Sequence, residues 1–80
     1  MSKILIIDDE RPIRSTLKEI LEFEKFQVDD AEDGKVGFDL IQKNKYELIL
    51  CDIKMPKMDG MEVLEKSISL GIDTPFIMIS

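Results

Sequence analysis

The sequence contains no histidine and a single cysteine, Cys51, and these two shortages exclude several kinds of active site. Without histidine there can be no Ser-His-Asp triad, no Cys-His dyad, no zinc helix built on two histidines and no histidine general base. One cysteine cannot form an internal disulfide or a four-cysteine metal site. We therefore expect non-covalent packing to hold the fold, with Cys51 as a small hydrophobic core residue.

Basic residues and long apolar runs are also scarce. Lys and Arg total 11 against 17 Asp and Glu, a formal net charge of −6 at pH 7, so the chain lacks the basic surface that nucleic-acid backbones require. Its apolar runs are far shorter than the ~20 residues that span a bilayer, and the first one is too short for a signal peptide. The 80 residues leave room for one small domain. We expect a soluble, cytoplasmic protein that contacts neither nucleic acid nor membrane.

Short apolar runs alternate with amphipathic stretches along the chain. Residues 4–7, 26–31, 46–51 and 76–79 have the branched apolar character of buried strands, the second more weakly than the others. Between them, apolar side chains recur at helical spacing in three segments, which begin near Pro12, after Asp33-Gly34 and after Asp59-Gly60. Asp59 and Glu62 have the spacing of a capping box, and Gly71 fits a helix end. This βαβαβαβ pattern predicts an α/β fold with a parallel sheet and helices on both faces.

Acidic residues follow two of the predicted strands directly: Asp8 and Asp9 after the first, and Asp52 after the third. Ligands of doubly wound sheets bind at the carboxyl ends of the strands, where the strand order reverses. In the strand order 2-1-3-4, that point lies between strands one and three. We therefore expect these three carboxylates to meet at one crevice. The structural alternative for the first pair is that Asp9 or Glu10 caps the following helix.

Three carboxylates in one crevice need a proton or a cation. Two unit charges ~4 Å apart repel by about 4 kcal/mol at an effective dielectric constant of 20. An all-oxygen site, without histidine or thiolate, favours a hard cation, with Mg²⁺ foremost. Because Mg²⁺ also holds phosphate oxygens, the sequence predicts a site for phosphoryl chemistry at a carboxylate.

Three segments carry a resemblance to a known family. Residues 4–10 (ILIIDDE), 48–60 (LILCDIKMPKMDG) and 76–80 (FIMIS), in this order, resemble the receiver domain of bacterial two-component response regulators. The resemblance spans the chain and implies that residues 1–80 are a receiver fragment. It implies a flavodoxin-like three-layer sandwich with a parallel sheet of order 2-1-3-4, lacking the usual last helix-strand-helix. The acid-x-Lys-Met-Pro segment is similar to regulators of the nitrogen-regulator type, which act on promoters through an AAA+ domain.

The resemblance also implies a role for each site residue. Asp52 would accept a phosphoryl group from a sensor histidine kinase. Asp9 would bind Mg²⁺ directly, with Asp52 and the backbone carbonyl of Lys54, while Asp8 would act through a metal-bound water. Ser80, at the same sheet edge, would be the switch hydroxyl that contacts the phosphoryl group. Such a module promotes its own phosphotransfer but is not a turnover enzyme, and it signals to an output domain that is absent from this chain.

The family pattern normally continues past Ser80, and its fifth strand bears an active-site lysine. We therefore expect weakened phosphotransfer activity in this chain. Residues 76–79 would form an unprotected sheet edge, which favours self-association into a homo-oligomer.

Other interpretations remain open at this point. A non-phosphorylated interaction module on the same fold needs no lysine. A nucleotide hydrolase would read residues 4–10 as a Walker B strand, but no phosphate-binding Gly-Lys loop precedes them. A phosphatase with an aspartate nucleophile would need an Asp-x-Asp spacing after the first strand, and that spacing is absent.

Overall fold

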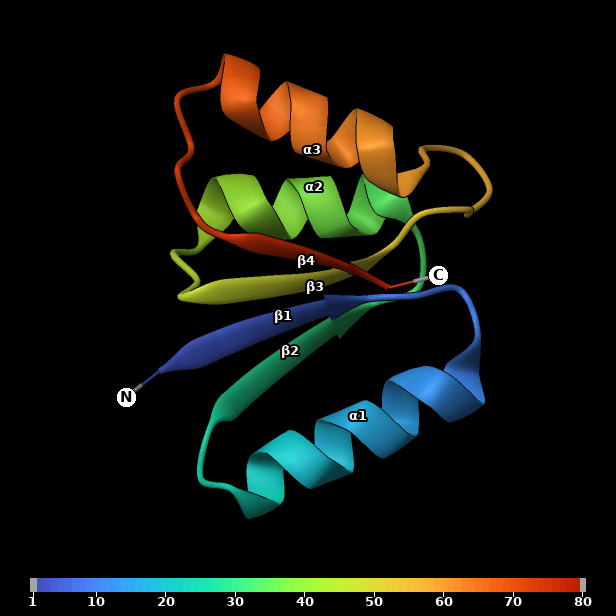
Figure 1. Cartoon of the computed structure of the whole chain (residues 1–80), viewed down its shortest axis with the longest axis vertical. Coiled ribbons are helices and arrows are strands. Elements are labelled where there is room, and N and C mark those ends of the chain that lie inside the picture. The colour runs from blue at the N-terminus through green and yellow to red at the C-terminus, as the bar shows by residue number, and fades with distance from the viewer. Residues whose placement is uncertain (1, 80) are drawn as a thin grey trace.

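The computed structural model describes residues 2–79, which form a sheet between two helical layers (Figure 1). The elements are β1 (Lys3–Ile7), α1 (Arg11–Phe23), β2 (Gln27–Ala31), α2 (Gly34–Lys43), β3 (Leu48–Asp52), α3 (Gly60–Ser69) and β4 (Phe76–Ile79). Helix α1 covers one face of the sheet, and α2 and α3 cover the other. Among the described helices, none is long and apolar enough to cross a membrane. The predicted α/β class and element order are confirmed.

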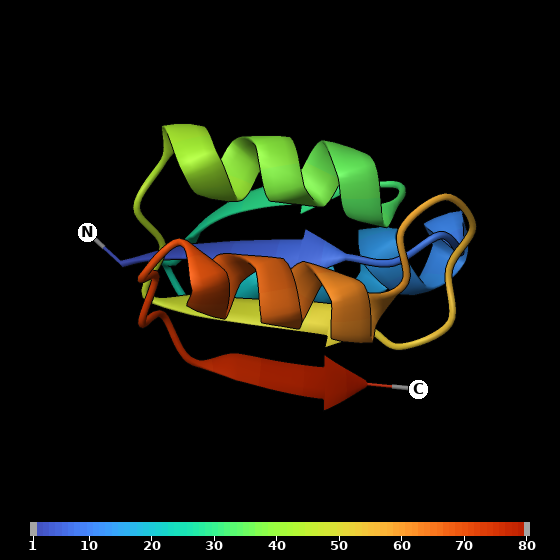
Figure 2. The same cartoon turned by 90° about the horizontal axis from the view of Figure 1, so that it is seen from above.

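The four strands are parallel and follow the predicted order, β2-β1-β3-β4. In the register of the central strand, Ile7 lies opposite Ala31 of β2 and Cys51 of β3. Figure 2 shows all four strands pointing the same way, so the loops that follow β1 and β3 leave the sheet at one end. The residues that come next along the two central strands, Asp8 and Asp52, are therefore neighbours.

The main core lies between the sheet and the layer formed by α2 and α3. Side chains alternate between the faces of a strand, and one face of β1 and β3 supplies half of this cluster. Its buried members are Leu5, Ile7, Ala31, Ile41, Tyr46, Ile49, Cys51 and Val63. Burial, followed by the negative charges of nearby aspartates, raises the pKa of the Cys51 thiol to about 12. Cys51 is therefore an inert core residue, as the sequence predicts.

The two ends of α3 are fixed by local chemistry. The Asp59 carboxylate accepts a hydrogen bond from the backbone N–H of Glu62 at 2.9 Å, so the Asp59 half of the predicted capping box is present. At the other end, Gly71 adopts φ +79°, and its N–H donates to the carbonyl of Ile68 at 2.9 Å. This left-handed residue, which follows the C-cap Leu70, is a typical glycine terminator. Both ends agree with the sequence prediction.

Candidate functional site

Three carboxylates meet at the carboxyl end of the two central strands. Asp8, Asp9 and Asp52 each offer one oxygen, and these oxygens lie within 4.8 Å of one another. Asp8 and Asp52 are buried, with 3% and 8% of their surface exposed, while Asp9 is exposed. The structure thus places the three acids together where the strand order reverses. An all-oxygen donor set of this kind fits Mg²⁺, which binds to one or two carboxylates and keeps several waters.

Asp8, the first of these acids, makes hydrogen bonds with Ala31 of β2 and with Glu10. The backbone N–H of Asp8 donates to the carbonyl of Ala31 at 3.1 Å, which extends the sheet pairing by one residue. Its Oδ1 accepts a hydrogen bond from the backbone N–H of Glu10 at 2.8 Å. Glu10 occupies the N-cap of α1 but makes no side-chain cap hydrogen bond. Glu10 is therefore the cap residue by position, as the alternative interpretation allows, but its side chain does not cap the helix.

The electrostatic cost of the cluster falls on Asp52, the last residue of β3. Burial raises the pKa of Asp52 above its ordinary value of 3.8, and the charge of Asp8 raises it further. The backbone N–H groups of Ile53 and Lys54 partly oppose this rise, because they favour the charged carboxylate. Asp52 is therefore a carboxylate held at a free-energy cost, which a bound cation would relieve.

A hollow of about 360 Å³ opens over this carboxylate, and Asp9, Glu10, Asp52, Ile53 and Lys54 line it. The space can hold a hydrated ion together with a phosphoryl group. The backbone of Lys54 lies beside the acids here, and its carbonyl as a metal ligand stays a prediction. The predicted switch hydroxyl, Ser80, lies outside the described residues.

The loop between β3 and α3 is closed and tied to its surroundings. The N–H of Gly60 donates to the carbonyl of Ile53 at 2.7 Å, so the chain returns to the end of β3. Lys57, with φ +69°, places its Nζ 3.4 Å from Oδ2 of Asp33. Asp33 is buried at the N-terminus of α2, where its carboxylate also accepts a hydrogen bond from the N–H of Val36 at 2.9 Å. Lys57 therefore ties the loop to the start of α2, although its side chain is 70% exposed.

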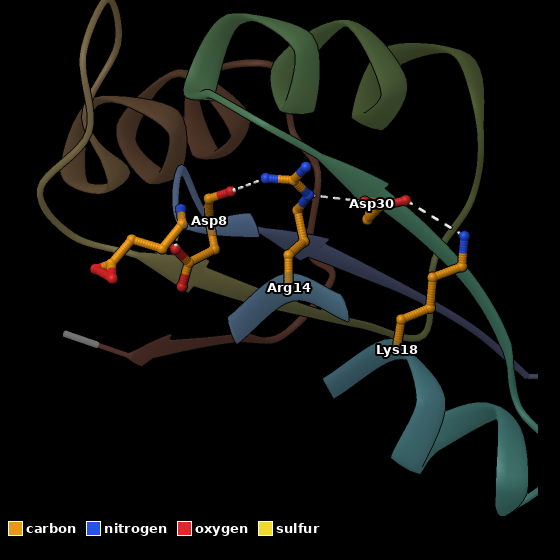
Figure 3. Close-up of polar contacts among 5 residues, drawn as sticks. Asp8, Arg14, Lys18 and Asp30 are labelled. Atoms are coloured by element: carbon orange, nitrogen blue, oxygen red, sulfur yellow. Dashed lines mark hydrogen bonds and ion pairs between the residues drawn. The ribbon is translucent and has the colours of Figure 1, made fainter. Parts of the chain in front are cut away.

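Two residues beside the site escaped the sequence prediction, namely Arg14 of α1 and Asp30 of β2 (Figure 3). The Arg14 Nη1 donates to the backbone carbonyl of Asp8 at 2.9 Å, and its Nε donates to Oδ2 of Asp30 at 2.8 Å. Lys18 lies 3.4 Å from the other oxygen of Asp30. Burial acts to raise the pKa of Asp30, but these two cations outweigh it and lower the pKa overall. The available signal was an acid inside a predicted strand, which calls for a cationic partner.

Comparisons with known proteins agree with this geometry. Residues 4–80 match the family model described as "Response regulator receiver domain". The chain is 36% identical over 78 residues to "Response regulator MprA" of Mycobacterium sp. (strain KMS), and 42% identical over 80 residues to "Transcriptional regulatory protein CpxR" of Escherichia coli (strain K12). These alignments cover 98% and 100% of this chain but only 34% of each relative, so the chain spans about a third of their length.

Solved structures show the same likeness. The receiver domain of the Francisella response regulator 1452 superposes with a TM-score of 0.94 at 33% identity, over 98% of this chain and 64% of that one. The response regulator TrrA from Thermotoga maritima, solved in complex with Mg²⁺-BeF, gives a TM-score of 0.91 at 36% identity, over 98% and 68% of the two chains. The order of elements, the acid cluster and both sets of matches lead to one conclusion: the chain belongs to the receiver-domain family of two-component response regulators.

Proposed function

We propose that Asp52 accepts a phosphoryl group from a sensor histidine kinase at a Mg²⁺ site formed with Asp8 and Asp9. The observation that carries this proposal is the cluster itself, with three carboxylate oxygens within 4.8 Å of one another and Asp52 only 8% exposed. The complex of TrrA with Mg²⁺-BeF, at 36% identity, supports the choice of metal. In this proposal the chain, residues 1–80, acts as one receiver unit in the cytoplasm.

The chemistry assigned to the residues is a single group transfer. A carboxylate oxygen of Asp52 attacks phosphorus in line, the bond from phosphorus to the kinase's histidine nitrogen breaks, and that nitrogen keeps the electron pair. The product is an acyl phosphate on Asp52. When bound, Mg²⁺ would neutralise charge on the phosphoryl oxygens. Asp9, Asp52 and the carbonyl of Lys54 are the proposed direct ligands, Asp8 acts through water, and the hydroxyl of Ser80 hydrogen-bonds to the transferred group.

The test uses beryllofluoride, which mimics a phosphoryl group on a carboxylate, and follows backbone amide signals by NMR. With Mg²⁺ present, we expect beryllofluoride to shift the amides around Asp52, and we expect Asp52→Asn to abolish the response. Asp59→Asn is the matched control, because this aspartate lies in the same segment, outside the acid cluster, and asparagine caps a helix equally well. An unchanged spectrum in the unmodified chain would contradict the proposal and favour a non-phosphorylated interaction module.

The finer parts of the assignment stay predictions. They are weakened phosphotransfer activity, signalling through an output domain to transcription, membership of the AAA+ group, and the absence of enzymatic turnover. Both relatives named above are described as regulators, and CpxR as a transcriptional one. A rate of phosphotransfer from a sensor kinase, measured for this chain, addresses the first of these predictions.

We also propose that a second copy of the chain pairs with the edge of β4. Among residues 2–79, β4 pairs with β3 alone, and its four residues, Phe76–Ile79, carry no charge. Ile77 is 50% exposed. An uncharged edge strand without proline is a template for pairing with another chain. Because each copy carries a net charge of −6, salt should strengthen the association.

Sedimentation velocity over a range of protein and salt concentrations measures this association. We expect the sedimentation coefficient to rise with both, and we expect Ile77→Lys to return the protein to a monomer. Ile68→Lys is the control, since Ile68 is 63% exposed and belongs to α3, outside the strand proposed to pair. A monomer at every concentration, or equal effects of the two lysine variants, would contradict edge pairing.

A further inference from the structure

We propose that Arg14 is a positioning residue for the metal site: it fixes Asp8 through the backbone carbonyl, with Asp30 as its anchor. This inference rests on the proposed Mg²⁺ site. Figure 3 shows the guanidinium between the two acidic residues, with one edge toward Asp8 and the other toward Asp30. No role in metal binding or phosphotransfer follows for Arg14 from its sequence position, because it stands among the charged residues of an amphipathic helix.

The geometry of the guanidinium makes the two contacts simultaneous. Arg14 Nη1 lies 2.9 Å from the carbonyl oxygen of Asp8, and Nε lies 2.8 Å from Oδ2 of Asp30. The side chain is only 15% exposed. A planar fork with several fixed N–H directions can satisfy both acceptors at once, whereas the single ammonium group of lysine is a point charge on a flexible stem.

These contacts complete the fixation of Asp8. Its backbone N–H is bound by Ala31, its Oδ1 by the N–H of Glu10, and its carbonyl by Arg14. The carbonyl belongs to the peptide that joins Asp8 to Asp9, where the chain leaves the sheet. With that peptide plane held, the directions of both neighbouring carboxylates are held too. A free peptide would let them turn away from Asp52.

Helix α1 offers little else to hold this end of the chain. None of its residues is fully buried, and Ile13 is 42% exposed. The helix therefore lies against the sheet without a locked apolar side chain. The polar link from Arg14 to β1 and β2 fixes the start of the helix relative to the acids, which is the kind of outer support that metal sites depend on.

The sign of the expected effect separates positioning from simple charge. A cation near a metal site repels the metal, so loss of the Arg14 charge by itself would tighten Mg²⁺ binding. Loss of positioning would weaken it. A purely structural role in global stability would leave the affinity of the folded protein unchanged. The three possibilities therefore predict different directions for one measured constant.

The experiment measures binding of Mn²⁺ by electron paramagnetic resonance, with Mg²⁺ as competitor, in the full chain and in Arg14→Gln, Arg14→Lys and Lys18→Gln. Mn²⁺ suits the same carboxylate and water ligands as Mg²⁺. We expect both Arg14 variants to bind about tenfold more weakly or worse, as outer-shell losses typically do. Lys18→Gln is the matched control. It also removes a positive charge beside Asp30, but Lys18 has no hydrogen bond to Asp8 in the structure, so this variant should bind Mn²⁺ like the parent chain.

A second readout needs no metal. In metal-free buffer, the amide proton of Glu10, which donates to Asp8 Oδ1 at 2.8 Å, should move upfield and exchange faster in Arg14→Lys, as Asp8 loosens. Asp30→Asn, which removes the anchor and keeps the arginine, should have the same effect.

The outcomes are distinct. If the parent chain binds Mn²⁺ and both Arg14 variants bind it equally well or more tightly, the inference is overturned. No Mn²⁺ binding in the parent chain overturns the proposed function instead, and the Glu10 amide then decides: an unchanged signal in Arg14→Lys and Asp30→Asn overturns the inference as well. If Arg14→Gln does not fold, Arg14→Lys and Asp30→Asn carry the test.

Discussion

Asp52→Asn is expected to raise the free energy of unfolding at neutral pH by about 1–2 kcal/mol in metal-free buffer. The physical reason is that Asp52 is buried beside Asp8 and Asp9, with oxygens within 4.8 Å of one another. One such repulsion at this distance is worth about 3.5 kcal/mol at an effective dielectric constant of 20, and the N–H groups of Ile53 and Lys54 offset part of it. Asparagine removes the charge and keeps the shape.

The stability gained by Asp52→Asn over the parent should increase as the pH rises. The pKa of Asp52 in the folded protein lies above its ordinary value of 3.8. Below pH 3.8 the residue is mostly protonated in both states and contributes nothing. As the pH rises above 3.8, the Asp52 carboxyl ionises first in the unfolded chain. The parent therefore loses stability until the pH exceeds the pKa of Asp52 in the folded protein. The difference between variant and parent should therefore grow from about pH 4 upward and then stay constant.

Urea unfolding followed by circular dichroism, with a chelator, measures this difference over the pH range. Asp30 and Asp33 have lowered pKa values and the opposite dependence, but they are present in both proteins and cancel. Asp59→Asn should change stability by less than about 0.5 kcal/mol at any pH, because it is a surface change that keeps the cap. Saturating Mg²⁺, at about 100 times its dissociation constant, should stabilise the parent by about 2.7 kcal/mol and Asp52→Asn by less. Parallel pH profiles for parent and Asp52→Asn would contradict the strained-carboxylate interpretation.

Gly60→Ala is expected to cost about 2–3 kcal/mol of folding free energy, at the upper end of overpacking effects. A Cβ at this position would overlap the backbone carbonyl oxygen of Asp52 and lie 2.8 Å from Cε of Met78. The methionine can move, but the carbonyl cannot move without shifting the end of β3. The hydrogen bond from Gly60 to Ile53, at 2.7 Å, would be strained as well.

Gly71→Ala is the control for this substitution. At Gly71 an added Cβ would meet nothing within 4 Å, so the cost comes only from φ +79° and should be about 1–2 kcal/mol. Denaturant unfolding compares the two variants, and Mn²⁺ binding adds a second criterion. Gly60→Ala should weaken binding because the clash falls on the backbone of Asp52, whereas Gly71→Ala should not. If the two variants lost the same stability and bound Mn²⁺ with the same affinity, the loop between β3 and α3 would be able to move enough to accommodate the added Cβ, which would contradict this prediction.

Much of the fold was accessible from local patterns. Continuous branched apolar runs, each followed by an amphipathic segment, required a parallel sheet with helical crossovers, and the structure has that sheet. Parallel strands end at one edge, so the acids that directly follow strands one and three become neighbours once these two strands are adjacent, as they are in the order that the family resemblance implies. The cap at Asp59 and the terminator at Gly71 were also predictable, because both depend on residues within one turn.

The contacts that finish the site were decided only by the tertiary structure. Arg14 and Asp30 are 16 positions apart, and the Lys57 to Asp33 pair likewise joins separate elements. Residue spacing in the sequence predicts neither contact. Each contact depends on how a crossover helix or loop packs against the sheet and on the register of the strands. The sequence by itself determined the alternation of strands and helices and the acids that follow strands one and three, and the family resemblance supplied the strand order that brings Asp8, Asp9 and Asp52 together. The packing of α1 decided that an arginine holds the first of these acids, since only the folded helix brings a guanidinium within hydrogen-bond distance of that carbonyl.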